Sequence, residues 1–331
     1  MRIILMGTGP FAVPAFDAIR AQGYNIVCVV TRPAQQVKSR KGPPPQPVRT
    51  WAESQGLEVT APPSINSTEA IESLAKLSPD LLVVCDYGQI LSDAALSTAK
   101  LGGINLHGSL LPKYRGAAPV QRALLAGDPL TGVSVIHMTP KLDGGPILAT
   151  AELSIAPEET AGELEERLSD LGVEPTLSAI SKLEDWDGTR VLGCNQDPQS
   201  VTRAPRLSKK EALIDWTRSN VQLDCFIRGM LPWPIAYTFL PTGDPKPPLR
   251  VAIKKARVIH SDSVEKEPYP VQLSGADGNI TPGSLLRTDR MLIQTGEGVL
   301  ELLQVQPAGK REMTGEEFMR GYQPALGTVM K

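Results

Sequence analysis

The sequence predicts an α/β protein with two domains: an N-terminal doubly wound, mostly parallel Rossmann-like sheet and a smaller, OB-like C-terminal β-barrel. Three observations support this fold class. Short apolar runs alternate with helical patterns through the first half of the chain, which is typical of βαβ units. Short strand-like runs separated by turns dominate after residue 250, as in small barrels. The length of 331 residues is sufficient for two domains.

The first elements form a βαβ unit. Residues 2–6 are an apolar run that ends at a Gly-Thr-Gly-Pro turn, residues 13–19 have a helical pattern, and residues 26–30 form a second apolar run. We then expect, in order, a helix at 48–55, a buried strand at 80–85, a short helix within 88–100, a strand ending at His107, a helix at 119–126, a strand at 132–138 and one long amphipathic helix at 160–183.

A polar, turn-rich stretch after residue 188 marks the domain boundary. We expect a first domain at residues 1–189, a linker at 190–207 and a second domain at 208–331. Within the second domain, short strands are expected at 250–258, 283–288, 291–295 and 300–305.

The cysteines and the N-terminus indicate the compartment. The four cysteines are far apart and form no CxxC pair, so neither a zinc site nor a disulfide framework is indicated. The N-terminal apolar run is too short for a signal peptide, and no window approaches the length of a membrane span. We therefore expect a cytoplasmic protein that has no membrane partner and binds no metal.

Charge is unevenly distributed along the chain. Residues 1–50 carry seven basic residues and one acidic residue, residues 151–190 carry eleven acidic and three basic residues, and residues 203–257 carry eleven basic and four acidic residues. Two basic segments separated by an acidic one suggest a polarised surface and a polyanionic partner. Solvated charges scattered over the surface are the alternative.

Two polar side chains, Asn105 and His107, leave the end of a predicted buried strand together. Side chains alternate along a strand, so Ile104 and Leu106 face one side and the polar pair faces the other. A turn rich in Gly, Ser and Pro follows at the carboxyl end of the strand, where open α/β sheets bind ligands. This position makes His107 a candidate for chemistry.

Asp143 lies in a Gly-rich loop past the strand at 132–138 and can reach the same sheet edge. An Asn amide and a His N–H stabilise an oxyanion developing on a carbonyl, and a nearby carboxylate orients the histidine. No obvious Ser or Cys nucleophile accompanies them, so the substrate would supply its own, for instance an amine. A buried structural histidine with an unrelated loop aspartate is the alternative. We expect His137, which shares a strand face with valines, to be packed.

The turn at residues 7–10 partly matches a dinucleotide fingerprint. Pro10 removes an N–H near the expected phosphate, and no acidic residue ends the second strand. A plain tight turn is therefore the favoured interpretation, and a nicotinamide dehydrogenase remains an alternative that cofactor titration tests.

The run N-L-H-G-S-L-L-P-K-Y-R-G-A-A-P at residues 105–119, followed by L-D-G-G at 142–145, resembles the folate-dependent formyltransferases. Residues 6–14, 214–216, 232–238 and 306–311 extend the resemblance over nearly the whole chain, specifically to methionyl-tRNA formyltransferases. The chain departs from the family pattern at Gly9-Pro10, where Pro and an acidic residue are usual, and at Lys141, where Gly is usual. It also departs at Asp86, near the expected pterin pocket, where a small apolar residue is common.

The resemblance implies a formyltransferase-type first domain that transfers the formyl group of 10-formyltetrahydrofolate to the α-amine of methionyl initiator tRNA. It implies that Asn105 and His107 stabilise the oxyanion and that Asp143 supports His107 and helps to move the proton. It also implies that no metal is required. The segment implied to contact folate consists of Ser109, Leu110, Leu111 and Pro112.

The basic loop at residues 32–47 resembles the loop that inserts at the tRNA acceptor end in this family, whose arginine aligns with Ser39 or, shifted by one residue, with Arg40. The residues expected to contact tRNA are Lys38, Arg40 and Lys41 in this loop, and Arg203, Arg206, Lys209 and Lys210 farther along. Lys254, Lys255 and Arg257 are further candidates for phosphate contacts. We expect a monomer, since no oligomerisation segment is evident.

Besides the dehydrogenase, two alternatives of different kinds remain. The first is a related formyltransferase that acts on a sugar-nucleotide amine or on glycinamide ribonucleotide; the C-terminal motifs and the basic loop disfavour it. The second is a folate-binding or RNA-binding module without catalysis; the presence of Asn105, His107 and Asp143 together disfavours it.

Overall fold

The computed structural model describes the chain except for residues 35–44, 189, 191, 244, 246 and 260–279. The chain divides into two compact units. The first unit contains residues 1–120, 129–155 and 163–206, and the second contains residues 121–128, 156–162 and 207–331. Two short pieces of the first half of the chain therefore cluster with the second unit.

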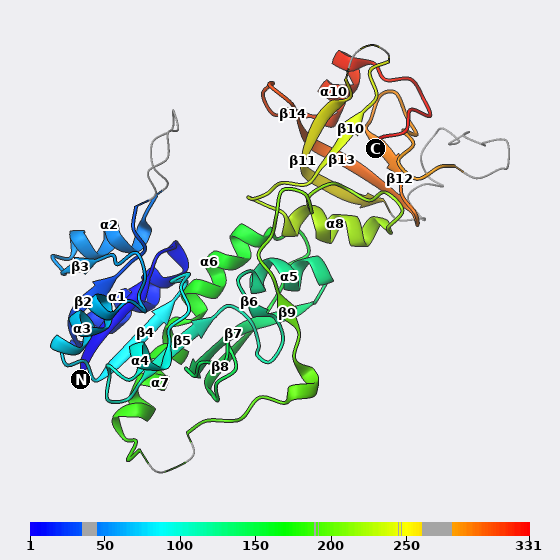
Figure 1. Ribbon diagram of the computed structural model, residues 1–331. Helices are drawn as coiled ribbons and strands as arrows, with labels where there is room; N and C mark the ends of the chain where they lie inside the picture. The colour runs from blue at the N-terminus through cyan, green and yellow to red at the C-terminus, as the bar shows by residue number, and fades with distance from the viewer. Residues whose placement is uncertain (35–44, 189, 191, 244, 246, 260–279) are drawn as a thin grey trace. The chain divides into compact units, whose positions relative to one another are not determined.

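The first unit is built on a seven-stranded sheet with the order β3-β2-β1-β4-β5-β7-β8 (Figure 1). The first five strands in this order pair in parallel, and β7 and β8 are added antiparallel. The strands are β1 (Arg2–Gly7), β2 (Asn25–Val30), β3 (Val59–Thr60), β4 (Leu81–Cys85), β5 (Gly103–His107), β7 (Leu130–His137) and β8 (Ile147–Ser154). A separate short pair joins β6 (Arg115–Gly116) in parallel to β9 (Arg203–Ala204).

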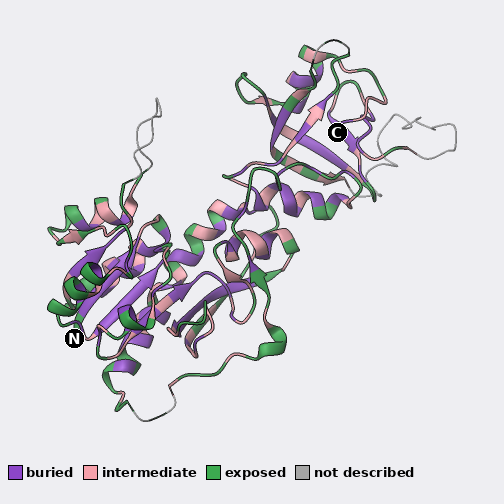
Figure 2. Ribbon diagram, viewed as in Figure 1, coloured by how far each residue is buried: buried purple, intermediate pink, exposed green. Residues whose placement is uncertain are grey.

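The helices cover both faces of this sheet, as expected for a doubly wound fold. Side chains of α3 and α4 join a buried apolar cluster with β1, β2 and β4, while α1 packs against α7, which also lies against β7 and β8. The central strands are buried over nearly their full length (Figure 2), because continuous apolar runs such as Leu81–Cys85 fill both faces. The helical elements are η1 (Pro10–Ala12), α1 (Val13–Ala21), α2 (Pro47–Ser54), α3 (Thr68–Lys76), α4 (Asp93–Leu96), α5 (Pro119–Ala126), α6 (Ala161–Leu171), α7 (Val173–Glu184) and η2 (Pro198–Ser200).

The second unit is an antiparallel half-barrel with the order β10-β11-β13-β12, and β14 pairs with β13. Helix α8 packs on β11 and β13, and both α8 and α10 begin with a capping box, at Ser219/Gln222 and Thr314/Glu317. The elements are α8 (Asn220–Gly229), β10 (Tyr237–Leu240), β11 (Leu249–Ile259), β12 (Leu292–Gln294), β13 (Val299–Pro307), β14 (Met313–Thr314) and α10 (Gly315–Tyr322). The predicted fold class is confirmed for both parts of the chain.

Two element predictions are wrong. The helix expected at 160–183 is two helices, α6 and α7, separated at Gly172. Pro175 lacks the N–H that a continuous helix would use and is tolerated only in a first turn, so α7 must start anew before it. Gly172 is also needed for close packing, because a Cβ there would lie 2.7 Å from Leu106 Cδ2. The strand expected at 283–288 is reduced to isolated bridges at Ser284 and Leu285.

The polar segment expected to be a linker makes contacts within the first unit. Its described residues include β9, and the unit division falls between Arg206 and Leu207. The domain boundaries at 189/190 and 207/208 stay predictions. His137 is packed as expected: its Nε2 lies 2.8 Å from the Leu101 carbonyl, and its ring meets Trp186 edge-on.

Candidate active site

Strand β5 presents Asn105 and His107 at the carboxyl edge of the sheet. The parallel neighbour β4 pairs Val84 with Asn105, and the antiparallel neighbour β7 pairs Ser134 with His107. Asn105 is partly exposed, whereas His107 is only 5% exposed. The alternation predicted from the sequence therefore places one open amide and one enclosed imidazole side by side.

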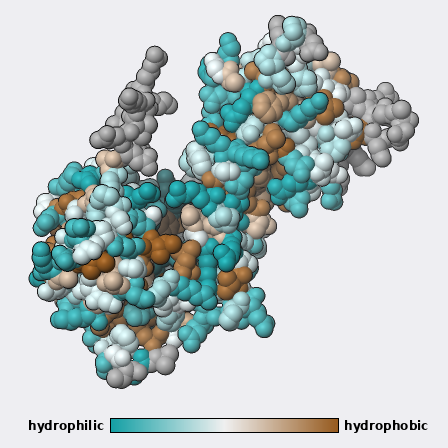
Figure 3. Space-filling view, in the orientation of Figure 1, coloured by the Kyte–Doolittle hydropathy of each residue, from teal (hydrophilic) through white to brown (hydrophobic). Residues whose placement is uncertain are grey.

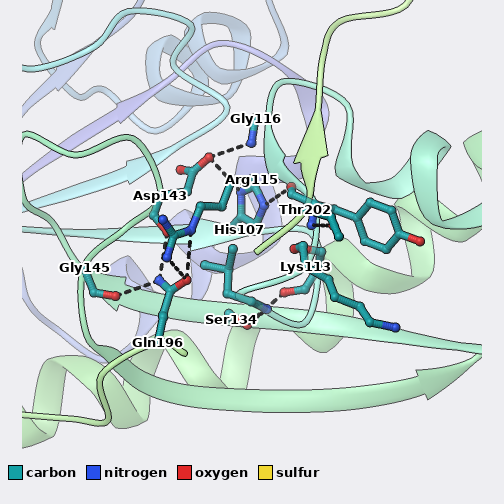
Figure 4. Close-up of polar contacts among 12 residues, drawn as sticks. His107, Lys113, Arg115, Gly116, Ser134, Asp143, Gly145, Gln196 and Thr202 are labelled. Carbon is teal, nitrogen blue, oxygen red and sulfur yellow. Dashed lines mark hydrogen bonds and ion pairs between the residues drawn. The ribbon is translucent and has the colours of Figure 1, made fainter. Parts of the chain in front are cut away.

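The contacts of the His107 ring define its protonation sites. Its Nε2 lies 2.9 Å from the Tyr114 carbonyl oxygen, and its Nδ1 lies 3.9 Å from Asp143 Oδ2 (Figure 4). A carbonyl oxygen only accepts, so Nε2 carries the proton of the neutral ring. Nδ1 is then the atom that gains a proton, on the side of the carboxylate. The 3.9 Å separation is too long for a direct hydrogen bond.

Asp143 is held by the backbone that surrounds it. Its Oδ2 accepts a 2.8 Å hydrogen bond from the Gly116 N–H, and its side chain is 10% exposed. Its backbone has a φ of 47°, in the left-handed region that aspartate tolerates better than most residues. The loop on which it sits is fixed by Gln196, whose Nε2 donates to the carbonyl oxygens of Asp143 and Gly145 at 2.8 and 2.7 Å.

Three residues that sequence reasoning missed hold the site together. Gln196 Oε1 accepts from Arg115 Nε and Nη2 at 3.0 and 2.7 Å (Figure 4), and Thr202 Oγ1 accepts from the Tyr114 N–H at 2.8 Å. Arg115 lies in the recognisable central motif, but Gln196 and Thr202 lie in the turn-rich segment interpreted as a linker. No local pattern marks them, because their partners are between 51 and 88 residues away in the chain.

The segment expected to contact folate follows β5 and is anchored to β7. Ser134 Oγ accepts from the Leu111 N–H at 3.0 Å and donates to the Ser109 carbonyl at 2.8 Å. The Ser109 hydroxyl is buried and donates to the Lys113 carbonyl, and Leu111 is also buried. Leu110 and Pro112 are partly exposed. Their open surfaces are therefore the parts of this segment that a ligand can reach.

Charged side chains gather beside the neighbouring strand ends, β1 and β4. Asp86 follows β4, its carboxylate accepts from the Gly9 N–H, and the charges of Arg32 and Arg206 act on it. Burial raises the pKa of Asp86 although the two arginines and the Gly9 hydrogen bond lower it. Burial, Asp86 and Glu166 together raise the pKa of Glu165, on α6, to about 7.

The residues expected to contact tRNA are in different situations. Lys38, Arg40 and Lys41 lie outside the described residues. Arg203, Arg206, Lys209 and Lys210 are exposed. Lys255 Nζ lies 3.1 Å from Glu158 Oε2, and Arg257 pairs with Glu301, so both cations are already compensated. Across the face of the molecule in Figure 3, hydrophilic surface predominates and hydrophobic patches are small.

No group of three or more His, Cys, Asp or Glu side chains among the described residues is arranged to hold a metal ion. No helix within the described ranges has the length and apolar character needed to cross a membrane.

Two family profiles match the chain. The profile described as formyl transferase matches residues 1–180, and the profile of the formyl transferase C-terminal domain matches residues 206–323. A methionyl-tRNA formyltransferase from Rhodopirellula baltica is 55% identical over 334 aligned residues, which cover 99% of this chain and 96% of the relative. The chain belongs to the methionyl-tRNA formyltransferase family. Another family member, from Desulfotalea psychrophila, is 39% identical and covers 100% of this chain and 96% of its own.

Solved structures share the fold of this formyltransferase. An N-formyltransferase from Helicobacter canadensis, in complex with folinic acid and dTDP-3-aminofucose, superposes with a TM-score of 0.63 at 15% identity and covers 91% of this chain and 98% of its own. HypX from Aquifex aeolicus, in complex with tetrahydrofolic acid, has a TM-score of 0.57 at 13% identity, covering 98% of this chain and 48% of its own. At these identities the likeness concerns the fold alone.

Proposed function

We propose that this formyltransferase transfers the formyl group of 10-formyltetrahydrofolate to the α-amine of methionyl initiator tRNA. The observation that carries the proposal is the grouping of Asn105, His107 and Asp143 at one sheet edge, in a chain 55% identical to a methionyl-tRNA formyltransferase. We expect it to act in the cytoplasm, because its acceptor is a substrate of translation initiation. We expect a monomer, since the sequence has no evident oligomerisation segment. Initiator tRNA and the folate are its expected partners.

The proposed reaction uses the acceptor amine as nucleophile. The amine lone pair attacks the formyl carbon, and the carbonyl oxygen becomes an oxyanion in the tetrahedral intermediate. The Asn105 amide and the protonated Nδ1 of His107 stabilise that oxyanion. When the intermediate collapses, the bond to the folate nitrogen breaks, and the proton lost by the amine ends on that nitrogen.

Asp143 supports this chemistry through His107. The 3.9 Å gap between Nδ1 and Oδ2 leaves Nδ1 of the imidazole available to the substrate, with the carboxylate on the same side of the ring. The Gly116 N–H keeps the carboxylate in place. We propose that the partly exposed side chains of Leu110 and Pro112 contact the folate donor. The buried Ser109 and Leu111 fix the position of the loop.

The test is transfer of labelled formyl from 10-formyltetrahydrofolate to methionyl initiator tRNA. Transfer by the wild type that collapses in Asn105→Ala and His107→Ala variants, with both variants folded, would support the function and the site together. Formylation of an amino sugar nucleotide or glycinamide ribonucleotide in place of the tRNA would assign the same chemistry to a different acceptor.

A further inference from the structure

The carboxyl ends of β1 and β4 are the place where the strand order of the sheet reverses. Strand β1 has β2 on one side and β4 on the other, and chain connections leave in opposite directions from this point. Doubly wound sheets bind ligands outside the strand ends at such a switch point. The residues that occupy it are Gly9, just past β1, and Asp86, just past β4.

Gly9 and Asp86 are in direct contact. The Gly9 N–H donates to the Asp86 carboxylate, and the Thr8 N–H donates to the Asp86 carbonyl at 3.1 Å. A Cβ on residue 9 would overlap Asp86 Oδ2. Gly9 has a φ of −84°, a backbone conformation that any residue can adopt. Glycine is needed here because the Asp86 carboxylate leaves no space for a Cβ.

Asp86 lies close to the proposed reaction centre. Val84 pairs with Asn105 across parallel strands, and Asp86 directly follows the end of β4 at Cys85, so it lies at the same sheet edge as His107. Neighbouring strands are about 4.8 Å apart. The Asp86 carboxylate points to the β1 side, toward Gly9, whereas the proposed folate segment lies on the β7 side of β5. The resemblance places the pterin of the donor near Asp86, but this direction of the carboxylate favours the acceptor.

The charges around Asp86 fit the end of an aminoacylated tRNA. Such an end brings one cation, the α-ammonium group, and one or more phosphodiester anions. Asp86 supplies an anion, and Arg32 and Arg206, which act on it electrostatically, supply two guanidinium groups suited to phosphate. An uncharged or singly charged small acceptor would leave part of this set unmatched.

We propose that Asp86 receives the α-ammonium group of the methionyl ester and takes its proton, so that the free amine attacks the formyl carbon. The N–H proton moves to a carboxylate oxygen, and the nitrogen lone pair becomes available. This inference rests on the proposed function. Asp86 is open at the surface, but the atoms packed around its carboxylate reduce its solvation and raise its pKa. It therefore accepts such a proton more readily than a fully solvated carboxylate.

Asp86→Asn is the decisive variant. Asparagine has the same shape, keeps an oxygen for the Gly9 N–H and tolerates the φ of 46° at this position, so the fold is retained. Asp80→Asn is the matched control, because Asp80 lies beside the opposite end of β4 and binds the Arg2 N–H at 2.7 Å and Lys100 at 3.0 Å. Thermal unfolding checks that each variant is folded.

The first readout is equilibrium binding without formyl donor. Wild type should bind methionyl-tRNA about tenfold more tightly than tRNA esterified with the α-hydroxy analogue of methionine, which has no ammonium group. The preference should fall to within about twofold in Asp86→Asn and persist in Asp80→Asn. An Asp86→Asn enzyme that keeps the preference, or that loses affinity for the folate donor instead, overturns the inference.

The second readout is the pH profile of kcat/KM. The α-amino group titrates near pH 8, so a proton acceptor matters below that pH and little above it. The charged groups facing Asp86, namely Arg32, Arg206 and Glu165, are the same in wild type and variant. The loss in Asp86→Asn should therefore shrink at least several-fold between pH 6.5 and 9. An equal loss at both pH values overturns the proton-accepting role. Failure of wild type to formylate any tRNA would instead overturn the proposed function.

Discussion

Two aspartates lie near the carboxyl ends of the neighbouring strands β5 and β4. Both have a positive φ, but their exposure and their hydrogen-bond partners differ. Asp143, which serves β5, has a φ of 47°, and Asp86, which follows β4, has a φ of 46°. Each left-handed aspartate costs roughly 1–3 kcal/mol. Asp143 is enclosed, with one oxygen bound to the Gly116 N–H, whereas Asp86 is exposed and rests against a glycine.

The difference separates two tasks. The enclosed Asp143 carboxylate is fixed by the Gly116 N–H and gives the neighbouring His107 a constant electrostatic environment, as a reaction centre requires. An exposed carboxylate, compensated by Arg32 and Arg206, can exchange those partners for an incoming charge. We therefore propose the β5 site for oxyanion stabilisation during formyl transfer, and the β4 site for binding and deprotonating the acceptor amine.

The strongest test of this division removes the β5 groups. Asn105→Ala and His107→Ala should each lower kcat by roughly 10²–10⁴-fold, because oxyanion and proton-transfer contributions have this size. The affinity for methionyl-tRNA should change little, in contrast to Asp86→Asn. Single-turnover formyl transfer at saturating tRNA measures the first quantity, and equilibrium binding measures the second. A large loss of tRNA affinity in either variant would break the comparison.

A smaller effect is expected from the support of the β5 site. Gln196→Ala removes the side chain that joins Arg115 to the carbonyls of Asp143 and Gly145, so the Asp143 loop loses its anchor. We expect kcat to fall about tenfold, as misplacement of a positioned group does. Gln199→Ala, an exposed residue of the same segment, is the control and should leave kcat unchanged. Equal behaviour of the two variants would contradict the anchoring role.

The contact between Gly9 and Asp86 at the β4 site is tested by adding a methyl group to residue 9. Gly9→Ala places a methyl group on the Asp86 carboxylate and should lower the free energy of unfolding by about 1–3 kcal/mol, the usual cost of overpacking. Asp86→Ala removes the obstacle, so adding Gly9→Ala in that background should cost less than about 0.5 kcal/mol. Urea unfolding of the four proteins gives the coupling free energy. Additive effects would show that the two residues do not share space.

Stability should also depend on the charge of Glu165. Its folded pKa of about 7 lies above its ordinary value of 4.5, through burial first and then through Asp86 and Glu166. With a raised folded pKa, the contribution of the protonated acid is complete below about pH 4.5 and is lost as the pH rises through about 7. Glu165→Gln should therefore stabilise the protein by about 1–2 kcal/mol at pH 8 and by little at pH 4. Urea titrations at both pH values measure this, with the exposed Glu166→Gln as a control of smaller effect.

The sequence predicted those features that depend on local pattern. Strand alternation and the following turn were enough to bring Asn105 and His107 to one sheet edge. Gln196 and Thr202 were beyond such reasoning, since a polar turn-rich segment has the same composition whether it is solvated or packed on a distant loop. The break at Gly172 was missed because apolar periodicity continues across it. Pro175 is the local signal for the break, because proline is tolerated only in the first turn of a helix. The Gly9–Asp86 contact depends on tertiary structure alone.

The smallest expected effect is on tRNA affinity, from exposed cations on either side of the boundary between the two units in the sequence. Arg203, Lys209 and Lys210 belong to neither aspartate site, and we expect them to bind tRNA phosphates without affecting chemistry. Each contact removed should lower the slope of log affinity against log salt concentration by about 0.7–0.9. Lys209→Gln and Lys210→Gln should therefore weaken tRNA binding at low salt and leave kcat at saturating tRNA unchanged. The matched control is Lys255→Gln, because Lys255 already pairs with Glu158, and its salt slope should stay that of wild type. A slope unchanged in all three variants would remove these lysines from the tRNA surface.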